Sequence, residues 1–277
     1  MLAIEGVSIT FHRGGVNERV ALDKITLHLN PGEFVAIIGS NGAGKSTLLN
    51  AVAGVFPVDA GSVKIDGEDI TRIPEYRRAH QVGRVFQDPM LGTAGSLTIE
   101  DNLSLAVRRG QTRRLRHAIG RKERSLFREE LARLELGLEN RLTTKAAFLS
   151  GGQRQALTLL MATLARPKLL LLDEHTAALD PRTAEKVATL TDSIVSSAGL
   201  TTLMVTHNME QALSLGSRTI MMHEGRVVLD ISGPQRQRLT VSDLLGLFER
   251  SAGGRFVSDR ALLSASASAS ASASASA

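Results

Sequence analysis

The segment GSNGAGKST, at residues 39–47, restricts the fold more than any other part of the chain. It has the form G-x-x-x-x-G-K-[ST], and it lies between an apolar run typical of a buried strand, FVAIIG, and a run typical of a helix, LLNAVAG. Glycines accept positive φ and let the backbone approach a ligand closely, so the loop N–H groups and the helix N-terminus can surround a phosphate. We therefore expect a phosphate-binding loop; a glycine-rich turn without a ligand is the weaker alternative.

Two side chains of this loop have specific expected roles. Lys45 reaches the β- and γ-phosphates, and the Ser46 hydroxyl binds Mg²⁺. The residues that we expect to hold the phosphates are Gly39, Ser40, Asn41, Gly42, Ala43, Gly44, Lys45, Ser46 and Thr47.

A second candidate site is the run LLLLDE, which ends in Asp173 and Glu174. A buried strand that delivers carboxylates at its end would place Asp173 near the metal and Glu174 beside the γ-phosphate. There Glu174 could orient or deprotonate the attacking water, a role worth about 10² to 10⁴ in rate. The alternative, an exposed acidic strand end, is less favoured because a phosphate loop precedes this run.

The third feature is FLSGGQRQ, where residues 150–153 have the S-x-x-Q form of a capping box that opens a helix to Arg166. Gly151 and Gly152 would present bare backbone at the positive end of that helix, which makes a second anion site. One chain then has two half-sites for phosphate. If they cannot meet within one molecule, two molecules must enclose the nucleotide between them.

The strand and helix patterns favour an α/β fold. The runs at 34–39, 168–173 and 200–207 are almost continuously apolar, as parallel strands buried on both faces are. Asp180 followed by Pro181 predicts a helix start, and the helix would end near Ser197. We expect a P-loop (RecA-like) core with a parallel sheet.

Two smaller units accompany this core. Partly alternating apolar residues at 4–11, 20–29 and 62–66 predict an N-terminal antiparallel β subdomain. Helical patterns at 98–109 and 112–136 predict an inserted helical subdomain over about 90–155. The ranges expected to close the chain are a hairpin at 219–230, a helix at 242–250, and a low-complexity tail at 251–277 that should be flexible and outside the domain at 1–250.

Charge and composition exclude several other classes. The chain has no cysteine, no apolar run long enough for a membrane span and no basic leader, so we expect a cytoplasmic protein. Of the net charge of +5, residues 108–128 contribute nine Lys or Arg against one acid, which leaves about −3 for the rest. Aromatic residues are only 3%. Neither an extended basic groove nor stacking platforms for nucleic acid are therefore expected.

Taken in order, these motifs resemble the ATP-binding cassette family, specifically the nucleotide-binding subunit of an ABC transporter, over residues 2–250. The loop at 39–47 is like Walker A, LLLLDE is like Walker B, and 149–153 is similar to the signature sequence. The single residues with family counterparts are Gln87 of the Q-loop, Asp180 of the D-loop, the switch histidine His207, and Phe11 in the place of the aromatic that stacks on adenine. His175 departs from the usual proline, and Phe11 from the commoner Tyr.

The resemblance implies a head-to-tail dimer, a homodimer or a pair of close relatives, that holds two ATP. Each ATP would lie between Walker A of one subunit and residues Ser150, Gly151, Gly152 and Gln153 of the other. Gln87, Ser46 and Asp173 would complete the Mg²⁺ shell with water, and His207 would contact the γ-phosphate. The resemblance thus implies catalytic roles for Glu174, His207, Gln87 and Lys45, and nucleotide contacts from Phe11 and Asp180.

The segments inserted into the cassette indicate which process ATP hydrolysis drives. Repair and chromosome ATPases carry a long coiled coil, and translation factors join two cassettes, whereas a lobe of about fifty residues joins the halves here. We expect a subunit on the cytoplasmic face of the membrane that powers a separate permease, an import system with an extracytoplasmic, amino-acid-type solute-binding protein. The alternative is an ABC-type ATPase acting on nucleic acid or the ribosome. The Arg-rich run at 108–128 could touch lipid headgroups or an acidic permease loop, or be a solvated helix face.

Overall fold

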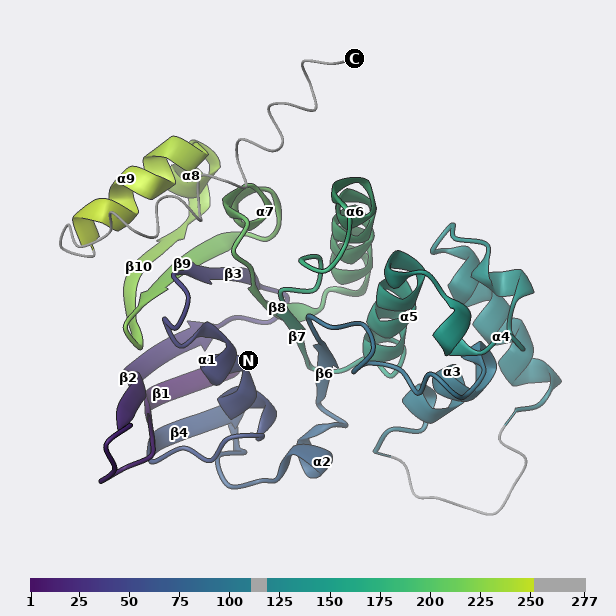
Figure 1. Ribbon diagram of the computed structural model, residues 1–277, viewed down its shortest axis with the longest axis horizontal. Coiled ribbons are helices and arrows are strands. Elements are labelled where there is room, and N and C mark those ends of the chain that lie inside the picture. Colours follow the sequence, from purple (N-terminus) through teal and green to yellow (C-terminus); the bar gives the residue numbers. More distant parts are fainter. Residues whose placement is uncertain (111–118, 252–277) are drawn as a thin grey trace.

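The computed structural model describes residues 1–110 and 119–251. Part of the Arg-rich run, 111–118, and the expected flexible tail beyond residue 251 lie outside this description. Six strands form the central sheet in the order β10-β9-β3-β8-β7-β6 (Figure 1). These strands are β3 (Phe34–Gly39), β6 (Val82–Val85), β7 (Leu169–Asp173), β8 (Thr201–Val205), β9 (Arg218–His223) and β10 (Arg226–Ser232).

The central sheet confirms the expected parallel core. Strands β3, β6, β7, β8 and β9 are parallel, and β10 turns back antiparallel to β9 at Glu224 and Gly225, as the hairpin pattern predicts. All residues of β3 and β8 are buried, because helices or the second sheet cover both faces. Strand β6 was not expected from the sequence, since it is only four residues long and Arg84 interrupts its apolar pattern.

A second, antiparallel sheet has the order β2-β1-β4-β5. Its strands are β1 (Leu2–Phe11), β2 (Arg19–Leu29), β4 (Ala60–Ile65) and β5 (Glu68–Asp69). Buried and more exposed residues alternate over much of β2, which is the pattern that the sequence analysis used to predict it. The expected N-terminal antiparallel β unit is therefore confirmed.

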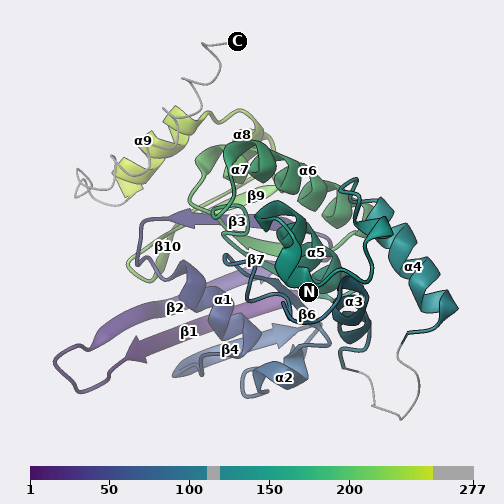
Figure 2. The same cartoon turned by 45° about the vertical axis from the view of Figure 1, so that its right-hand side comes forward.

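Helices cover the sheets and form a separate cluster at one side (Figure 2). The helices of the core are α1 (Lys45–Ala53), α2 (Glu75–Arg78), α6 (Pro181–Ala198), α7 (Met209–Ser214), α8 (Gly233–Gln237) and α9 (Val241–Ser251). Those of the side cluster are α3 (Ile99–Val107), α4 (Arg121–Ala132), the short helices η1 (Leu138–Asn140) and η2 (Ala146–Phe148), and α5 (Gly151–Thr163). Within the described ranges, none of the helices combines the length and apolar character that a membrane crossing requires.

The prediction of a helix over 112–136 is wrong in its bounds within the described residues 119–136; residues 112–118 lie outside the description. Helix α4 begins only at Arg121, where the Glu123 carboxylate accepts the Gly120 N–H at 2.9 Å and caps the first turn. It ends at Ala132, and the left-handed φ values of Glu135 (54°) and Gly137 (69°) then turn the chain away. A charged, helix-favouring composition does not reveal where such a turn falls.

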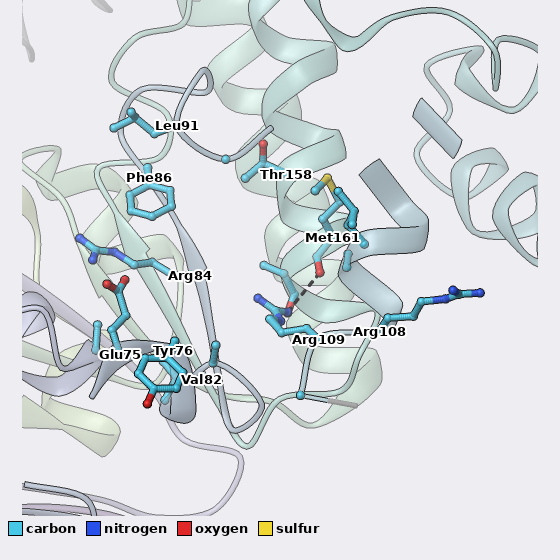
Figure 3. Close-up of a pocket in the computed structure, with 17 residues that line it drawn as sticks. Glu75, Tyr76, Val82, Arg84, Phe86, Leu91, Arg108, Arg109, Thr158 and Met161 are labelled. Carbon is cyan, nitrogen blue, oxygen red and sulfur yellow. Dashed lines mark hydrogen bonds between the residues drawn. The ribbon is translucent and has the colours of Figure 1, made fainter. Parts of the chain in front are cut away.

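A cleft of about 1140 Å³ separates the central sheet from the side cluster (Figure 3). One wall carries Glu75 and Tyr76 of α2 together with Arg84 and Phe86, while Arg108, Arg109, Thr158 and Met161 line the other. On the second wall, the Arg109 guanidinium donates to the backbone oxygens of Met161 and Ala162 at 3.3 and 3.1 Å. This wall is thus fastened from the end of α3 to α5.

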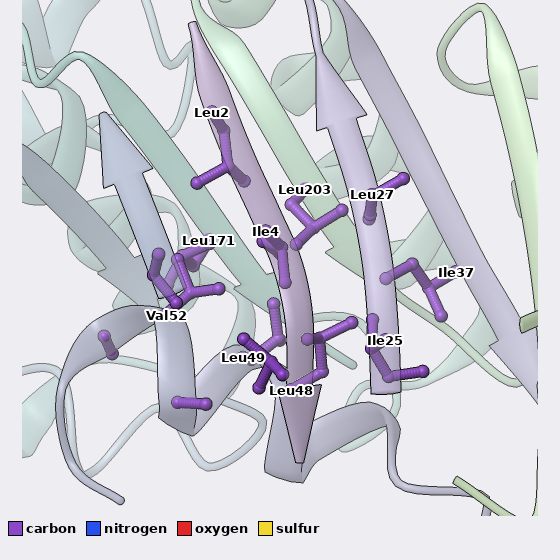
Figure 4. Close-up of a cluster of buried hydrophobic side chains, with 14 of the residues drawn as sticks. Leu2, Ile4, Ile25, Leu27, Ile37, Leu48, Leu49, Val52, Leu171 and Leu203 are labelled. Atoms are coloured by element: carbon purple, nitrogen blue, oxygen red, sulfur yellow. The ribbon is translucent and has the colours of Figure 1, made fainter. Parts of the chain in front are cut away.

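The largest apolar core lies where both sheets meet helix α1 (Figure 4). The antiparallel sheet contributes Leu2 and Ile4, and the central sheet contributes Leu171 and Leu203. Leu48, Leu49 and Val52 come from α1. Because α1 follows the phosphate loop directly, this packing fixes the helix N-terminus and the loop against a rigid platform.

Candidate nucleotide-binding site

The loop at residues 39–47 joins the end of β3 to the start of α1, as the sequence predicts. Gly39, Gly42 and Gly44 all have positive φ, at 149°, 77° and 96°. A Cβ on Gly39 would lie 2.1 Å from the Met222 oxygen, and one on Gly44 2.4 Å from the Ala21 oxygen, so only glycine fits at either position. The glycines therefore let the loop pack its backbone closely against β9 and β2, which fixes its path.

Lys45 is held inside the loop. Its side chain is buried, and Nζ donates to the backbone oxygens of Gly39 and Ser40 at 2.8 and 3.0 Å. An ammonium group at this place sits beside the N-terminus of α1, where both the helix dipole and the lysine favour an anion. The geometry is that of a phosphate cradle.

Ser46 and Asp173 meet although 127 positions separate them in sequence. The ends of β3 and β7 lie at the same edge of the parallel sheet, and there the Ser46 hydroxyl donates to Asp173 Oδ1 at 3.2 Å. Burial raises the pKa of Asp173, while the bond from Ser46 and the charge of Arg84 oppose that rise. One hydroxyl and one carboxylate oxygen suit Mg²⁺, which binds few protein oxygens and takes its remaining ligands from phosphate and water. The donor set therefore fits this ion.

Glu174 and His207 form the next pair along the same edge. Glu174 leaves β7 with a left-handed φ of 44°, and its N–H donates to the Val205 oxygen at 2.9 Å. Its carboxylate accepts a bond from His207 Nδ1 at 3.3 Å. This bond lowers the pKa of Glu174 and raises the pKa of His207. The turn at the strand exit lets both acidic residues act at one edge, although neighbours in a strand point to opposite faces.

Residues 150–153 face a different part of the molecule. Ser150 and Gln153 form the predicted capping box, with reciprocal bonds of 3.3 and 3.2 Å, at the start of α5. Gly152 packs so closely on α6 that an added Cβ would lie 2.2 Å from Thr183 Cγ2. Within the described residues, the side chains of Ser150 and Gln153 each bond to the backbone N–H of the other, and Gln153 also donates to the Leu136 oxygen; these bonds do not involve the loop at 39–47. The capping box thus makes the start of α5 a second candidate edge for phosphate, apart from the loop at 39–47.

The chain is similar to known proteins over most of its length. The family model described as "ABC transporter" matches residues 22–177. The chain is 46% identical to the tyrosine transport ATP-binding protein of Clostridioides difficile, over 90% of this chain and 99% of that protein. The chain belongs to the ABC transporter family. It is an ATP-binding cassette subunit, and members of this family are ATPases, so ATP is the nucleotide of the site.

Two further comparisons support the assignment. The chain is 38% identical to the methionine import ATP-binding protein MetN of Rhizobium etli, over 75% of this chain but only 56% of that longer protein. Among solved structures, the dimeric ATP-binding cassette MJ0796 bound to ADP and Pi gives a TM-score of 0.72 at 29% identity, over 87% of this chain and all of that one. The ABC fold expected from the sequence is confirmed.

Gln87 is exposed and follows Phe86, the residue after β6 that lines the cleft. The segment around it is bound to α5 by contacts that sequence reasoning missed. The buried Gln155 amide donates to the Phe86 oxygen at 3.1 Å, and the Arg154 guanidinium contacts Met90 Sδ. Arg154 and Gln155 directly follow the segment 149–153, so these contacts fix helix α5 against the segment around Gln87.

Phe11 lies partly buried near the other end of the site. Its ring packs edge-on against Phe56 with the centroids 5.3 Å apart. Its partner across the β1–β2 ladder is Arg19, whose guanidinium donates to the Gly42 oxygen of the phosphate loop at 2.8 Å. Sequence reasoning overlooked Arg19; the signal available was its place at the start of the strand that pairs with Phe11.

Asp180 and His175 both contact helix α6. Asp180 caps α6 by accepting the Thr183 N–H at 3.1 Å, as predicted from the Asp-Pro pair. His175 is buried beside Thr191, with Nε2 and Oγ1 2.9 Å apart, and burial lowers its pKa to about 4. The Thr191 hydroxyl already donates to the Val187 oxygen, so His175 Nε2 carries the proton and donates. In this ABC subunit His175 is a neutral structural side chain.

Proposed function

We propose that this subunit hydrolyses Mg²⁺-ATP to drive the import of an amino-acid-type solute through a separate membrane permease. The observation that carries the proposal is the row of groups at one sheet edge: the loop at 39–47, the Ser46–Asp173 pair and the Glu174–His207 pair. The names of the relatives, one in tyrosine transport and one in methionine import, support the transport class and the type of solute.

We infer the following roles in hydrolysis. Lys45 and the loop N–H groups bind the β- and γ-phosphates, and Ser46, Asp173 and Gln87 hold Mg²⁺, which neutralises phosphate charge when bound. Glu174 accepts the proton of the attacking water; its lowered pKa keeps the carboxylate ionised and ready to act as a base. His207, whose pKa is raised, donates a hydrogen bond to the γ-phosphate.

We further propose that the second edge acts on a partner's nucleotide. Residues 150–153 would bind the γ-phosphate held by the loop of another copy or a close relative, and Asp180 would contact that nucleotide. Phe11, whose strand partner Arg19 reaches the loop at 39–47 of the same chain, would contact the adenine. The capping box supports this role because it sets the backbone of Gly151 at a helix N-terminus, where an anion is favoured. The dimeric form of the related cassette MJ0796 also supports it.

The cleft beside α3 and α5 is our candidate for the permease contact. Its walls combine apolar side chains such as Tyr76 and Leu91 with the cations of Arg84 and Arg108, which suits a short helix carrying a carboxylate. Through this contact the subunit would sit at the cytoplasmic face of the membrane, with a solute-binding protein on the other side. We assign residues 1–250 to the ATPase domain, with the helical subdomain at about 90–155.

Uptake measured in reconstituted vesicles tests the proposal. The subunit is combined with the membrane protein that co-purifies with it and with a tyrosine-binding protein, and the uptake of labelled tyrosine is followed with ATP on the side of the subunit. We expect ATP-dependent uptake that Glu174→Gln abolishes. Glu210→Gln, at an exposed position on α7, is the matched control and should transport normally. Uptake at equal rates in both variants would refute the assigned function.

A further inference from the structure

Arg84 lies between the metal carboxylate and the cleft. It belongs to β6, and its side chain is only 13% exposed. On one side its Nη2 lies 3.6 Å from Asp173 Oδ2. On the other side it lines the cleft near Glu75, with its guanidinium 4.5 Å from the ring centre of Phe86 (Figure 3). One side chain thus touches both regions of the molecule.

The two oxygens of Asp173 are divided between two partners. Oδ1 accepts the bond from Ser46, on the side of the phosphate loop, and Oδ2 faces Arg84. A ligating carboxylate whose second oxygen is fixed by a neighbour presents its first oxygen in a defined direction, and such supporting partners typically contribute about 10- to 100-fold in metal affinity or activity.

The position of Arg84 is not explained by packing alone. Its Nε is buried without a hydrogen-bond partner, and burial lowers the pKa of the guanidinium. Burying a charged group with an unpaired donor costs free energy, and an apolar side chain in this strand would avoid that cost. The ion pair with Asp173 and the stacking on Phe86 are the contacts that offset it.

We propose that Arg84 is a positioning residue for the metal site: it holds Asp173 Oδ2 so that Oδ1 faces Ser46. Because the same guanidinium stacks in the wall of the cleft, anything that enters the cleft and moves Arg84 also changes the orientation of the metal carboxylate. The link between the cleft and the metal carboxylate rests on the proposed permease contact; the positioning of Asp173 by Arg84 does not.

The test is the Mg²⁺ dependence of nucleotide binding, measured without a permease. The chain has no Trp, so a fluorescent, non-hydrolysable ATP analogue serves as the reporter. The Mg²⁺ concentration for half-maximal tight binding is compared in wild type, Arg84→Met and Arg84→Lys. Arg72→Met, at an exposed position outside the lining of the cleft, is the matched control.

We expect Arg84→Met to raise the Mg²⁺ midpoint about 10-fold and to leave analogue binding in EDTA within about twofold of wild type. Arg84→Lys should recover part of the shift because it keeps the charge. The control should match wild type. An unchanged midpoint in Arg84→Met, or an equal loss of binding with and without Mg²⁺, would overturn the proposal, since the second result indicates a purely structural role.

A second variant covers the case in which Arg84→Met does not fold. Phe86→Leu removes the ring under the guanidinium but keeps Arg84 and the backbone oxygen that Gln155 uses. We expect its Mg²⁺ midpoint to rise by a smaller factor, about threefold; a wild-type midpoint would overturn the proposal. If wild-type binding shows no Mg²⁺ dependence at all, the metal role assigned under Proposed function fails instead.

Discussion

Glu174 and His207 each change the protonation of the other. The bond between them lowers the pKa of Glu174 and raises the pKa of His207. The two side chains are therefore oppositely charged over a wider pH range than a glutamate and a histidine with ordinary pKa values would be. His207 is about half exposed, so its charge is screened and the pair contributes little to stability. The pair instead keeps an ionised carboxylate, Glu174, and a hydrogen-bond donor, His207, at the edge of the sheet.

Replacing His207 by Ala should therefore affect the reaction more than the binding. We expect kcat for ATP hydrolysis to fall about 10²-fold, because one hydrogen bond to the transferring phosphoryl group is lost, while ATP affinity changes about twofold. His28→Ala, at an exposed position on β2, provides the control. Steady-state kinetics measure kcat for both variants. Equal kcat values for His207→Ala and His28→Ala would show that His207 has no role in the reaction.

His175 makes a pH-dependent contribution to stability. Its pKa falls from 6.5 in the unfolded chain to about 4 in the fold, because the buried ring cannot easily accept a charge. The unfolded chain thus takes up a proton below pH 6.5 and the folded chain does not, so stability is full above pH 6.5 and is lost as the pH falls towards 4.

The prediction compares wild type with His175→Gln, which does not titrate. Between pH 7 and pH 5 the difference in unfolding free energy, wild type minus variant, should shrink by about 2 kcal/mol. Urea denaturation at the two pH values measures it. A difference that stays constant would show that the ring already accepts a proton in the folded state.

At the scale of residues, the sequence was informative where a motif carries its own geometry. Ser46 and Asp173 meet because the loop after β3 and the end of β7 lie at the same edge of the parallel sheet. Arg19 and Arg84 could not be found in this way. Their partners come from strand pairing and burial, which a single sequence does not specify.

At the scale of elements, α5 connects the signature to the cleft and depends on close packing against α6. Gly152 has no room for a side chain, since an added Cβ would lie 2.2 Å from Thr183 Cγ2, whereas a Cβ on Gly151 would make an ordinary contact at 3.4 Å with Leu179. The space available for a Cβ atom therefore differs between these two neighbouring glycines. Only the second one of the pair is required by helix packing.

This difference gives a prediction with a built-in control. Gly152→Ala should destabilise the fold by about 1–3 kcal/mol through overpacking, and Gly151→Ala by less than about 0.5 kcal/mol. Adding Thr183→Ser removes the offending methyl group and should restore most of the loss in Gly152→Ala. Thermal and urea unfolding of the three variants measure the effect; equal stability of the two single variants would contradict the packing described for α5.

Elements with a strong period were predicted well, and those set by local turns were not. The strands β3, β7 and β8 were found from their continuous apolar runs, which reflect burial on both faces. The bounds of α4 were wrong because Glu135 and Gly137 take left-handed backbone conformations that composition does not announce. Strand β6 was missed because its pairing with β7, and not its own pattern, makes it a strand.

At the scale of the whole molecule, the two proposed phosphate-binding edges lie in different packing units. The loop at 39–47 is fixed to the core of both sheets, while residues 150–153 begin a helix of the side cluster. If ATP joins the loop of one subunit to the signature of another, nucleotide binding draws two molecules together and hydrolysis releases them. A permease segment bound in the cleft would move as the two subunits associate and separate.

Crosslinking between two differently labelled chains tests this dimer most directly, because the sequence has no cysteine and each introduced thiol is unique. One chain carries Asn41→Cys in the phosphate loop and the other Phe148→Cys, an exposed position just before the signature; both also carry Glu174→Gln to prevent hydrolysis. With a short thiol crosslinker, we predict a crosslinked pair of unlike chains in Mg²⁺-ATP and none with ADP. A lack of crosslinks in Mg²⁺-ATP, or crosslinking within a single chain that carries both cysteines, would contradict the shared-nucleotide dimer.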